Sequence, residues 1–133
     1  MKTVLSPIFL IVILLFGCTS SYHASDFTEI QLSDNYFKVS YNGGGVGDEE
    51  KTDLTLLRSA EVAQHHGFTY FAIIIEDNYS DTSGDTKPLG GRNSYRTAKP
   101  SLSNTILCFK SLQLGPSYDV NVIIPSLRKK YNI

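Results

Sequence analysis

The chain has 133 residues and a nearly even charge balance, with 12 lysines and arginines against 13 aspartates and glutamates and a formal net charge of −1. This length suits one small domain with a single core. Because the sequence has no basic cluster, it disfavours nucleic acid as a partner and offers no polybasic patch for anionic lipid.

The N-terminal segment predicts export and attachment to a membrane. An apolar run, residues 4–16, follows Lys2. The run has about 13 residues, which is too short for a membrane-spanning helix and typical of the apolar part of a secretory signal peptide. The run ends in Leu15, Phe16, Gly17 and Cys18, a sequence that resembles the lipobox of bacterial lipoproteins.

The lipobox resemblance implies a lipid anchor. The chain is expected to be cut between Gly17 and Cys18, and the Cys18 thiol to carry a diacylglyceryl group, so that membrane lipid is a partner. The alternatives are an ordinary signal peptide with a chance cysteine and an uncleaved anchor helix, and the short apolar run argues against the helix. We therefore expect a signal peptide at 1–17, a lipidated cysteine and tether at 18–25, and a single domain at 26–133.

Two further residues bear on location and redox state. Thr19 follows the lipidated position, and by resemblance to lipoprotein sorting in Gram-negative bacteria a residue other than aspartate implies the outer membrane, facing the periplasm. With Cys18 acylated, Cys108 has no partner for an internal disulfide, and we expect it to be a small residue of the core.

Four segments have the pattern of β-strands. Residues 27–32 and 36–41 alternate on either side of a turn signal and predict an antiparallel hairpin. The residues expected to face the core are Thr28, Ile30 and Leu32 in the first strand and Phe37, Val39 and Tyr41 in the second. The continuous apolar run 68–75 predicts a strand in the centre of the sheet, antiparallel to a strand at 105–110.

Residues 48–66 predict an amphipathic helix that ends at Gly67. Its expected buried stripe is Leu56, Leu57, Ala60, Ala63 and Gln64, with Lys51, Thr55, Ser59 and His66 opposite. Arg58 and Glu61 are three residues apart and are expected to form a structural pair. His65 and His66 lack a third ligand nearby, so no metal or other cofactor is expected.

A C-terminal helix is predicted after Ser117, which is expected to cap it, with a break or restart near Pro125. The elements together predict an α+β fold in the order ββαββα. We expect two layers, with an antiparallel sheet of about four strands and both helices packed on it.

Residues 77–103 are polar throughout and predict a long loop, which is either disordered or functional. Four of its side chains are of types that anchor protein interfaces: Tyr79, Arg92, Tyr95 and Arg96. This loop is therefore the expected interaction loop for an envelope protein partner. The glycine-rich stretch 42–47 is not a phosphate-binding loop, because the lysine and Ser/Thr pair of that motif is absent.

Three motifs resemble a known family. They are a Phe-x-Val strand that leads to a glycine turn (37–43), a Leu-Leu-Arg-x-Ala-Glu helix (56–61) and a Gly-aromatic strand entry at Gly67 and Phe68. Together with residues 99–101, Ile106 and residues 109–110, they resemble a family of small proteobacterial lipoproteins of unassigned function. The resemblance implies a fold and a location in the cell envelope. It implies no activity, because the family has none established.

The sequence therefore predicts a non-catalytic binding, sensing or envelope-interaction module. A structural envelope lipoprotein without a ligand is the alternative, and a small periplasmic hydrolase is a weaker one, because Cys108 is expected to be buried and His23 lies in the tether. A cleft that collected Arg58, Glu61, Tyr70 and the glycine stretch would favour an enzyme.

Overall fold

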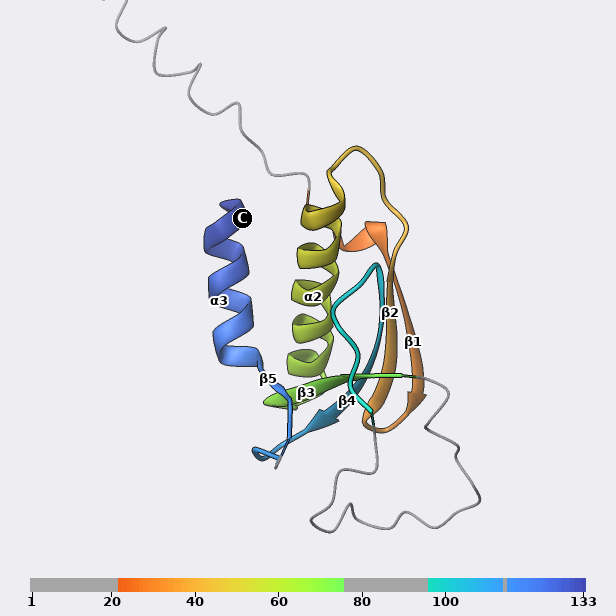
Figure 1. Ribbon diagram of the computed structural model, residues 1–133, viewed down its shortest axis with the longest axis vertical. Coiled ribbons are helices and arrows are strands. Elements are labelled where there is room, and N and C mark those ends of the chain that lie inside the picture. Colours follow the sequence, from red (N-terminus) through yellow and green to blue (C-terminus); the bar gives the residue numbers. More distant parts are fainter. Residues whose placement is uncertain (1–21, 76–95, 114) are drawn as a thin grey trace, which may run out of the picture.

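The computed structural model describes residues 22–75, 96–113 and 115–133. These residues form a five-stranded antiparallel sheet in the order β1-β2-β4-β3-β5, with helices α2 and α3 packed on it (Figure 1). The elements in chain order are η2 (Ala24–Asp26), β1 (Phe27–Ser33), β2 (Tyr36–Tyr41), α2 (Asp48–His65), β3 (Tyr70–Ile74), β4 (Ser103–Phe109), β5 (Tyr118–Asp119) and α3 (Val120–Tyr131). The predicted α+β fold is confirmed. The sheet has one strand more than the expected four. This strand is β5, whose two residues are too few to show an alternating pattern.

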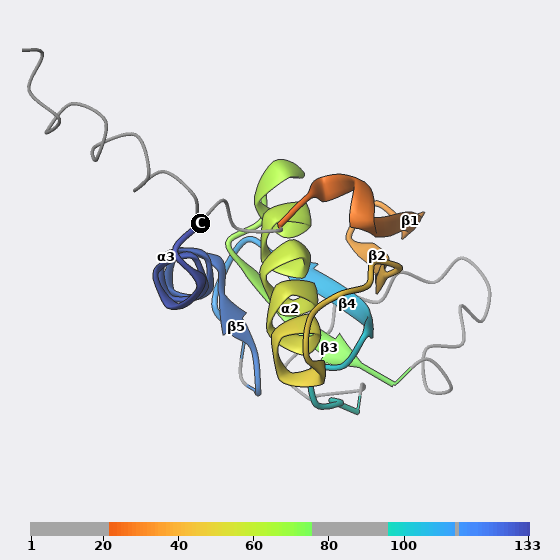
Figure 2. The same cartoon turned by 90° about the horizontal axis from the view of Figure 1, so that it is seen from above.

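The main core lies between the sheet and α2. Its fully buried members come from three strands, from the apolar side of α2 and from the first residue of α3: Phe37, Val39, Ala60, Ala63, Phe71, Ile106, Cys108 and Val120. Ile123, Ile124 and Leu127 of α3 pack against this cluster. Figure 2 shows α2 between α3 on one side and the β1–β2 hairpin on the other. Helix α2 therefore packs on strands β2, β3 and β4 and on helix α3.

Strand β1 forms the predicted hairpin with β2, but its faces are opposite to those expected. Phe27 pairs with Tyr41 and Glu29 with Val39, so that Phe27 and Glu29 lie on the helix side. Ile30 and Leu32 are each 48% exposed on the other side. The expectation of a buried Thr28, Ile30 and Leu32 is therefore wrong. The register with β2 decides the face of an edge strand, and alternation within the strand does not.

The centre of the sheet is β4 and not β3. Strand β4 pairs with β2 on one side and β3 on the other, whereas the outer edge of β3 is covered by the short β5 and by a bridge from Ile74 to Thr97. In both β3 and β4, every residue after the first is buried. A continuous apolar run marks burial on both faces, which these two neighbouring strands share.

Helix α2 buries two hydroxyl residues that were expected to face solvent. Thr55 and Ser59 are fully buried, whereas Gln64 of the expected stripe is exposed. Each hydroxyl donates to the carbonyl four residues earlier, and Ser59 Oγ also accepts from Asn104 Nδ2 on β4 at 3.3 Å. These hydrogen bonds satisfy the hydroxyls, so that the helix can bury them at small cost.

Helix α3 runs from Val120 to Tyr131 without the expected break. Asp119 caps it by accepting a hydrogen bond from Asn121 N–H at 2.9 Å, so Ser117 is not the cap. Pro125 stands inside the helix and is exposed. Pro125 lies in the middle of α3, where its missing N–H removes one intrahelical hydrogen bond, and the exposed carbonyl that loses this donor can bind water.

Residues 96–103, the end of the predicted loop, are ordered. The Ile75 N–H donates to Arg96 O at 3.0 Å, and the Ala98 N–H donates to Ile73 O at 2.9 Å. Ser103 already belongs to β4. The rest of the loop, 77–95, lies outside the described residues. Among the described helices, none is long and apolar enough to cross a membrane.

Gly67 gives a test of the helix end. Its φ is +84°, and a Cβ built there would meet no atom within 4 Å. We expect Gly67→Val to destabilise the domain by about 1–2 kcal/mol through backbone strain alone. Chemical denaturation measures the change. Gly44→Val is the control, because a Cβ at Gly44 is equally free of contacts and its φ is not positive. Equal stability of the two variants would contradict the prediction.

Candidate functional site

A cluster of charged side chains surrounds Glu61 on α2. Glu61 Oε2 accepts hydrogen bonds from the Tyr22 hydroxyl at 2.7 Å and from Arg58 Nη1 at 3.1 Å, and Oε1 accepts one from Arg128 Nη2 at 2.9 Å. The Glu61 side chain is only 13% exposed. Both oxygens of this carboxylate are therefore engaged, which favours a structural role over that of a general base.

In this cluster Arg58 is positively charged and the Tyr22 hydroxyl is protonated, so that both can donate hydrogen bonds to Glu61. Arg58 forms a second ion pair with Glu29 of β1. Burial lowers the pKa of Arg58, but the neighbouring Glu29 and Glu61 outweigh it and raise the pKa overall. Burial, and then the Glu61 carboxylate, raise the pKa of Tyr22 well above its ordinary value. The Tyr22 hydroxyl therefore stays protonated and donates to Glu61.

The cluster connects four separate segments of the chain. Tyr22 precedes η2, Glu29 lies on β1, Arg58 and Glu61 lie one helical turn apart on α2, and Arg128 lies in the last turn of α3. A cleft of about 380 Å³ adjoins it, lined by Glu29, Arg58, Glu61, Val62, Gln64, His65 and Arg128. Neither Tyr70 nor the glycine stretch at 42–47 lines this cleft.

A second ionic contact fixes α3 to the first turns of α2. Lys130 Nζ lies 2.6 Å from Asp53 Oδ2 and 3.3 Å from Glu49 Oε1, and the Tyr131 hydroxyl also donates to Asp53. Burial raises the pKa of Asp53, but Lys130 and Tyr131 outweigh it, so that the pKa is lowered overall. The folded state therefore favours the ionised form of Asp53.

This lowered pKa predicts a pH-dependent contribution to stability. The contribution is fully present above the unfolded-state pKa of Asp53, near 3.8, and is lost as the pH falls through the lower folded-state value. We expect Asp53→Asn to cost about 0.5–1 kcal/mol near pH 7 and progressively less at an acidic pH below 3.8. Urea unfolding at both pH values measures it.

The control for Asp53 is Asp34→Asn. Asp34 lies exposed in the turn between β1 and β2, where asparagine is equally compatible. Its substitution should leave stability nearly unchanged at both pH values. An Asp53→Asn penalty of the same size at neutral pH and at an acidic pH below 3.8 would show that the ionised carboxylate contributes nothing.

The remaining candidates for chemistry are poorly placed. Cys108 is buried on β4, and burial raises its pKa to about 12, so its thiolate is scarce near neutral pH. His23, His65 and His66 are exposed, and the ring of His66 lies 4.5 Å from that of Phe37. In the described part of the chain, no three His, Cys, Asp or Glu side chains gather as a metal site requires.

The structure brings together Arg58 and Glu61, as the helical spacing predicts, and adds three partners that sequence reasoning missed. Glu29 was assigned to the wrong face of β1, and neither Tyr22 nor Arg128 carries any local signal of its distant partner. Arg96 is exposed and is not part of the cluster. The other predicted site residues, Gly17, Cys18, Tyr79, Arg92 and Tyr95, lie outside the described residues.

Comparison of the chain with known protein families, curated proteins and solved structures finds no match.

Proposed function

We propose that this protein is a lipid-anchored lipoprotein of the cell envelope, attached through Cys18 to the outer membrane and facing the periplasm, where it acts as a non-catalytic interaction module. The observation that carries the proposal is the attachment of Tyr22 to Glu61 at 2.7 Å. Tyr22 lies four residues after Cys18 in the sequence. The tether is thus short, and the fold begins where it ends.

The chemistry of the described residues supports an interaction role over catalysis. Both oxygens of Glu61 are engaged by hydrogen-bond donors, and the Cys108 thiol is buried with a raised pKa. Neither group is free to act as a base or nucleophile. The resemblance to small proteobacterial lipoproteins is consistent with such an anchored module.

Mass spectrometry of the protein extracted from membranes tests the anchor. We expect a mature chain that begins at Cys18 and carries a diacylglyceryl group and an N-linked acyl chain. A mature chain without lipid, or one that keeps residues 1–17, would contradict the proposal.

Cross-linking in intact envelopes tests the interaction. We expect the wild-type protein to form a cross-linked species of defined mass with an envelope protein. Joint substitution of Tyr79, Arg92, Tyr95 and Arg96 by alanine should abolish that species without loss of the fold, because these side chains are of the types that dominate interface energies. A wild-type protein that forms no such species would favour the structural alternative.

A further inference from the structure

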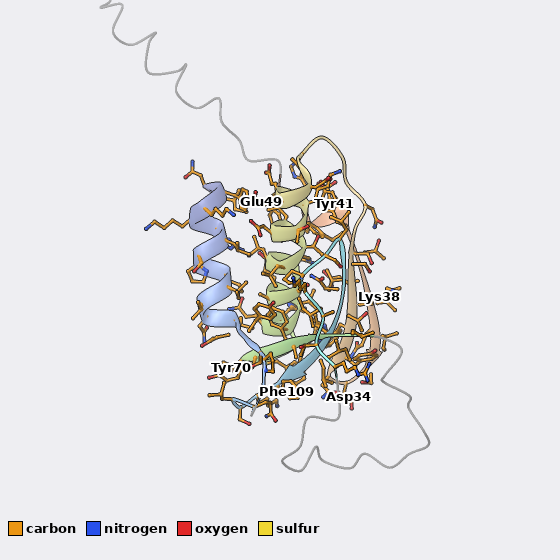
Figure 3. All side chains as sticks on the ribbon, viewed as in Figure 1. Asp34, Lys38, Tyr41, Glu49, Tyr70 and Phe109 are labelled. Atoms are coloured by element: carbon orange, nitrogen blue, oxygen red, sulfur yellow. The ribbon has the colours of Figure 1, made fainter. Side chains whose placement is uncertain are left out.

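The domain has two distinct ends. Figures 1 and 2 show that the described chain begins beside α2, at the same end as the C-terminus of α3. Figure 3 shows Glu49 and Tyr41 toward this end, and Tyr70 and Phe109 at the opposite end. The contact of Lys130 with Glu49 at 3.3 Å also places the end of α3 beside the start of α2. We call the end that holds Tyr22 and the last turn of α3 the entry end.

The chain is fixed to the entry end from Tyr22 onward. The Tyr22 ring lies 5.7 Å from the Phe27 ring, which in turn lies 5.2 Å from the Tyr41 ring. In the chain between Tyr22 and Phe27, the Asp26 N–H donates to His23 O at 3.0 Å and closes a short turn. Together with the hydroxyl of Tyr22 on Glu61, these contacts leave little freedom between the tether and the sheet.

The number of residues between Cys18 and Tyr22 limits how far the entry end can lie from the lipid. Cys18 and Tyr22 are four residues apart, and four extended residues span at most about 14 Å. An acylated Cys18 lies at the bilayer surface. A domain that is held this closely, and by one end, cannot turn freely.

We propose that the entry end is a membrane-facing surface, with Tyr22, His23, Arg128 and Lys129 against the phospholipid headgroups. This inference depends on the proposed lipid anchor and adds to it the orientation of the domain. The opposite end, which carries Tyr70 and Phe109, then faces away from the membrane and toward any partner.

The charges of the entry end specify the kind of lipid. Lys129 is an exposed cation that can bind a phosphodiester, whereas Arg128 is paired with Glu61, and Lys130 with Asp53 and Glu49. The surface is therefore of mixed charge and suits zwitterionic headgroups, whose phosphate every phospholipid shares. Anionic lipid is not required.

Two exposed lysines provide matched positions for a depth measurement. Lys129 lies in the last turn of α3 at the entry end, and Lys110 follows Phe109 at the opposite end. Single Lys129→Cys and Lys110→Cys variants of the lipidated protein can be labelled with a fluorophore, because the native Cys108 is buried with a raised pKa and Cys18 is acylated. The labelled proteins are placed in phosphatidylethanolamine–phosphatidylcholine vesicles that contain lipid with a spin-labelled headgroup.

We expect headgroup quenching to be several-fold stronger for the label at 129 than for the label at 110. Equal quenching, or stronger quenching at 110, would overturn the orientation. If mass spectrometry shows that the protein is not acylated, the proposed function is overturned together with the orientation that depends on it. The two failures are thus distinguishable.

A second substitution separates an orienting role of Tyr22 from a merely structural one. Tyr22→Phe removes the hydroxyl that reaches Glu61 and should reduce the difference in quenching between positions 129 and 110, while acylation stays complete. The control is Tyr70→Phe, which removes a hydroxyl at the opposite end and should preserve the difference. An unchanged difference in Tyr22→Phe would show that the hydroxyl does not hold the orientation.

Discussion

Cys18→Ser should abolish attachment of fatty acid and leave the protein either soluble or as an unprocessed precursor. Serine has no thiol to accept the diacylglyceryl group, and the lipoprotein cleavage follows that modification. Metabolic labelling with a fatty acid, followed by fractionation of the envelope, measures both outcomes. Because stable anchoring takes two or more acyl chains, loss of the acceptor should move nearly all of the mature protein out of the membrane fraction.

The control for this experiment is Cys108→Ser. Cys108 is buried on β4, and its substitution leaves the lipobox intact. The variant should incorporate fatty acid at the wild-type level. Incorporation of label into Cys18→Ser at the wild-type level would refute the anchor and would direct attention to another attachment site.

Glu61→Leu should be the most destabilising of the proposed surface substitutions. It removes the acceptor for Tyr22, Arg58 and Arg128 at once, and the Arg58 side chain, which is only 23% exposed, keeps Glu29 as its remaining partner. Removal of one partner from a fully buried ion pair costs about 3–5 kcal/mol. Because this cluster is partly exposed, we expect about 2 kcal/mol, which lowers the melting temperature of a domain of this size by roughly 10 °C.

Arg128→Leu is the matched control for the Glu61 prediction. The Arg128 side chain is 50% exposed, and its removal leaves Glu61 with both Tyr22 and Arg58. We expect a change of at most about 0.5 kcal/mol. Thermal unfolding followed by circular dichroism compares the two variants. If Glu61→Leu melts at the wild-type temperature, the cluster does not stabilise the fold.

Much of the fold could be predicted because its signals are local. The expected helix at 48–66 differs from α2 by one residue, Gly67 has the positive φ of a helix-terminating glycine, and the β1–β2 and β3–β4 pairings are antiparallel as expected. The helix, its terminating glycine and the β1–β2 hairpin each depend on side chains within one element or one turn of chain, and β3 and β4 are marked as strands by their own apolar runs. Periodicity and turn chemistry report such features directly.

The errors arise where the outcome depends on contacts between distant segments. Alternation in β1 is compatible with either face, and the pairing of Glu29 opposite Val39 selects the one that places Glu29 near Arg58. Thr55 and Ser59 are polar by composition, but the buried Asn104 lies opposite Ser59 and makes burial acceptable. Only Arg58 and Glu61 could be paired from the sequence, because Tyr22 and Arg128 are 39 and 67 residues from Glu61.

The unusual orientation of β1 also bears on how copies of this protein meet one another. As an edge strand, β1 presents one row of backbone groups that the described sheet does not pair, next to the exposed Ile30 and Leu32. Such an edge invites another strand to add to it. The register shift between Gln31 and Ser33 distorts the row, and Glu29 carries a charge toward the helix side, where it pairs with Arg58. Both features oppose edge-to-edge pairing, so the ion pair that fixes β1 also helps to keep the domain from aggregating.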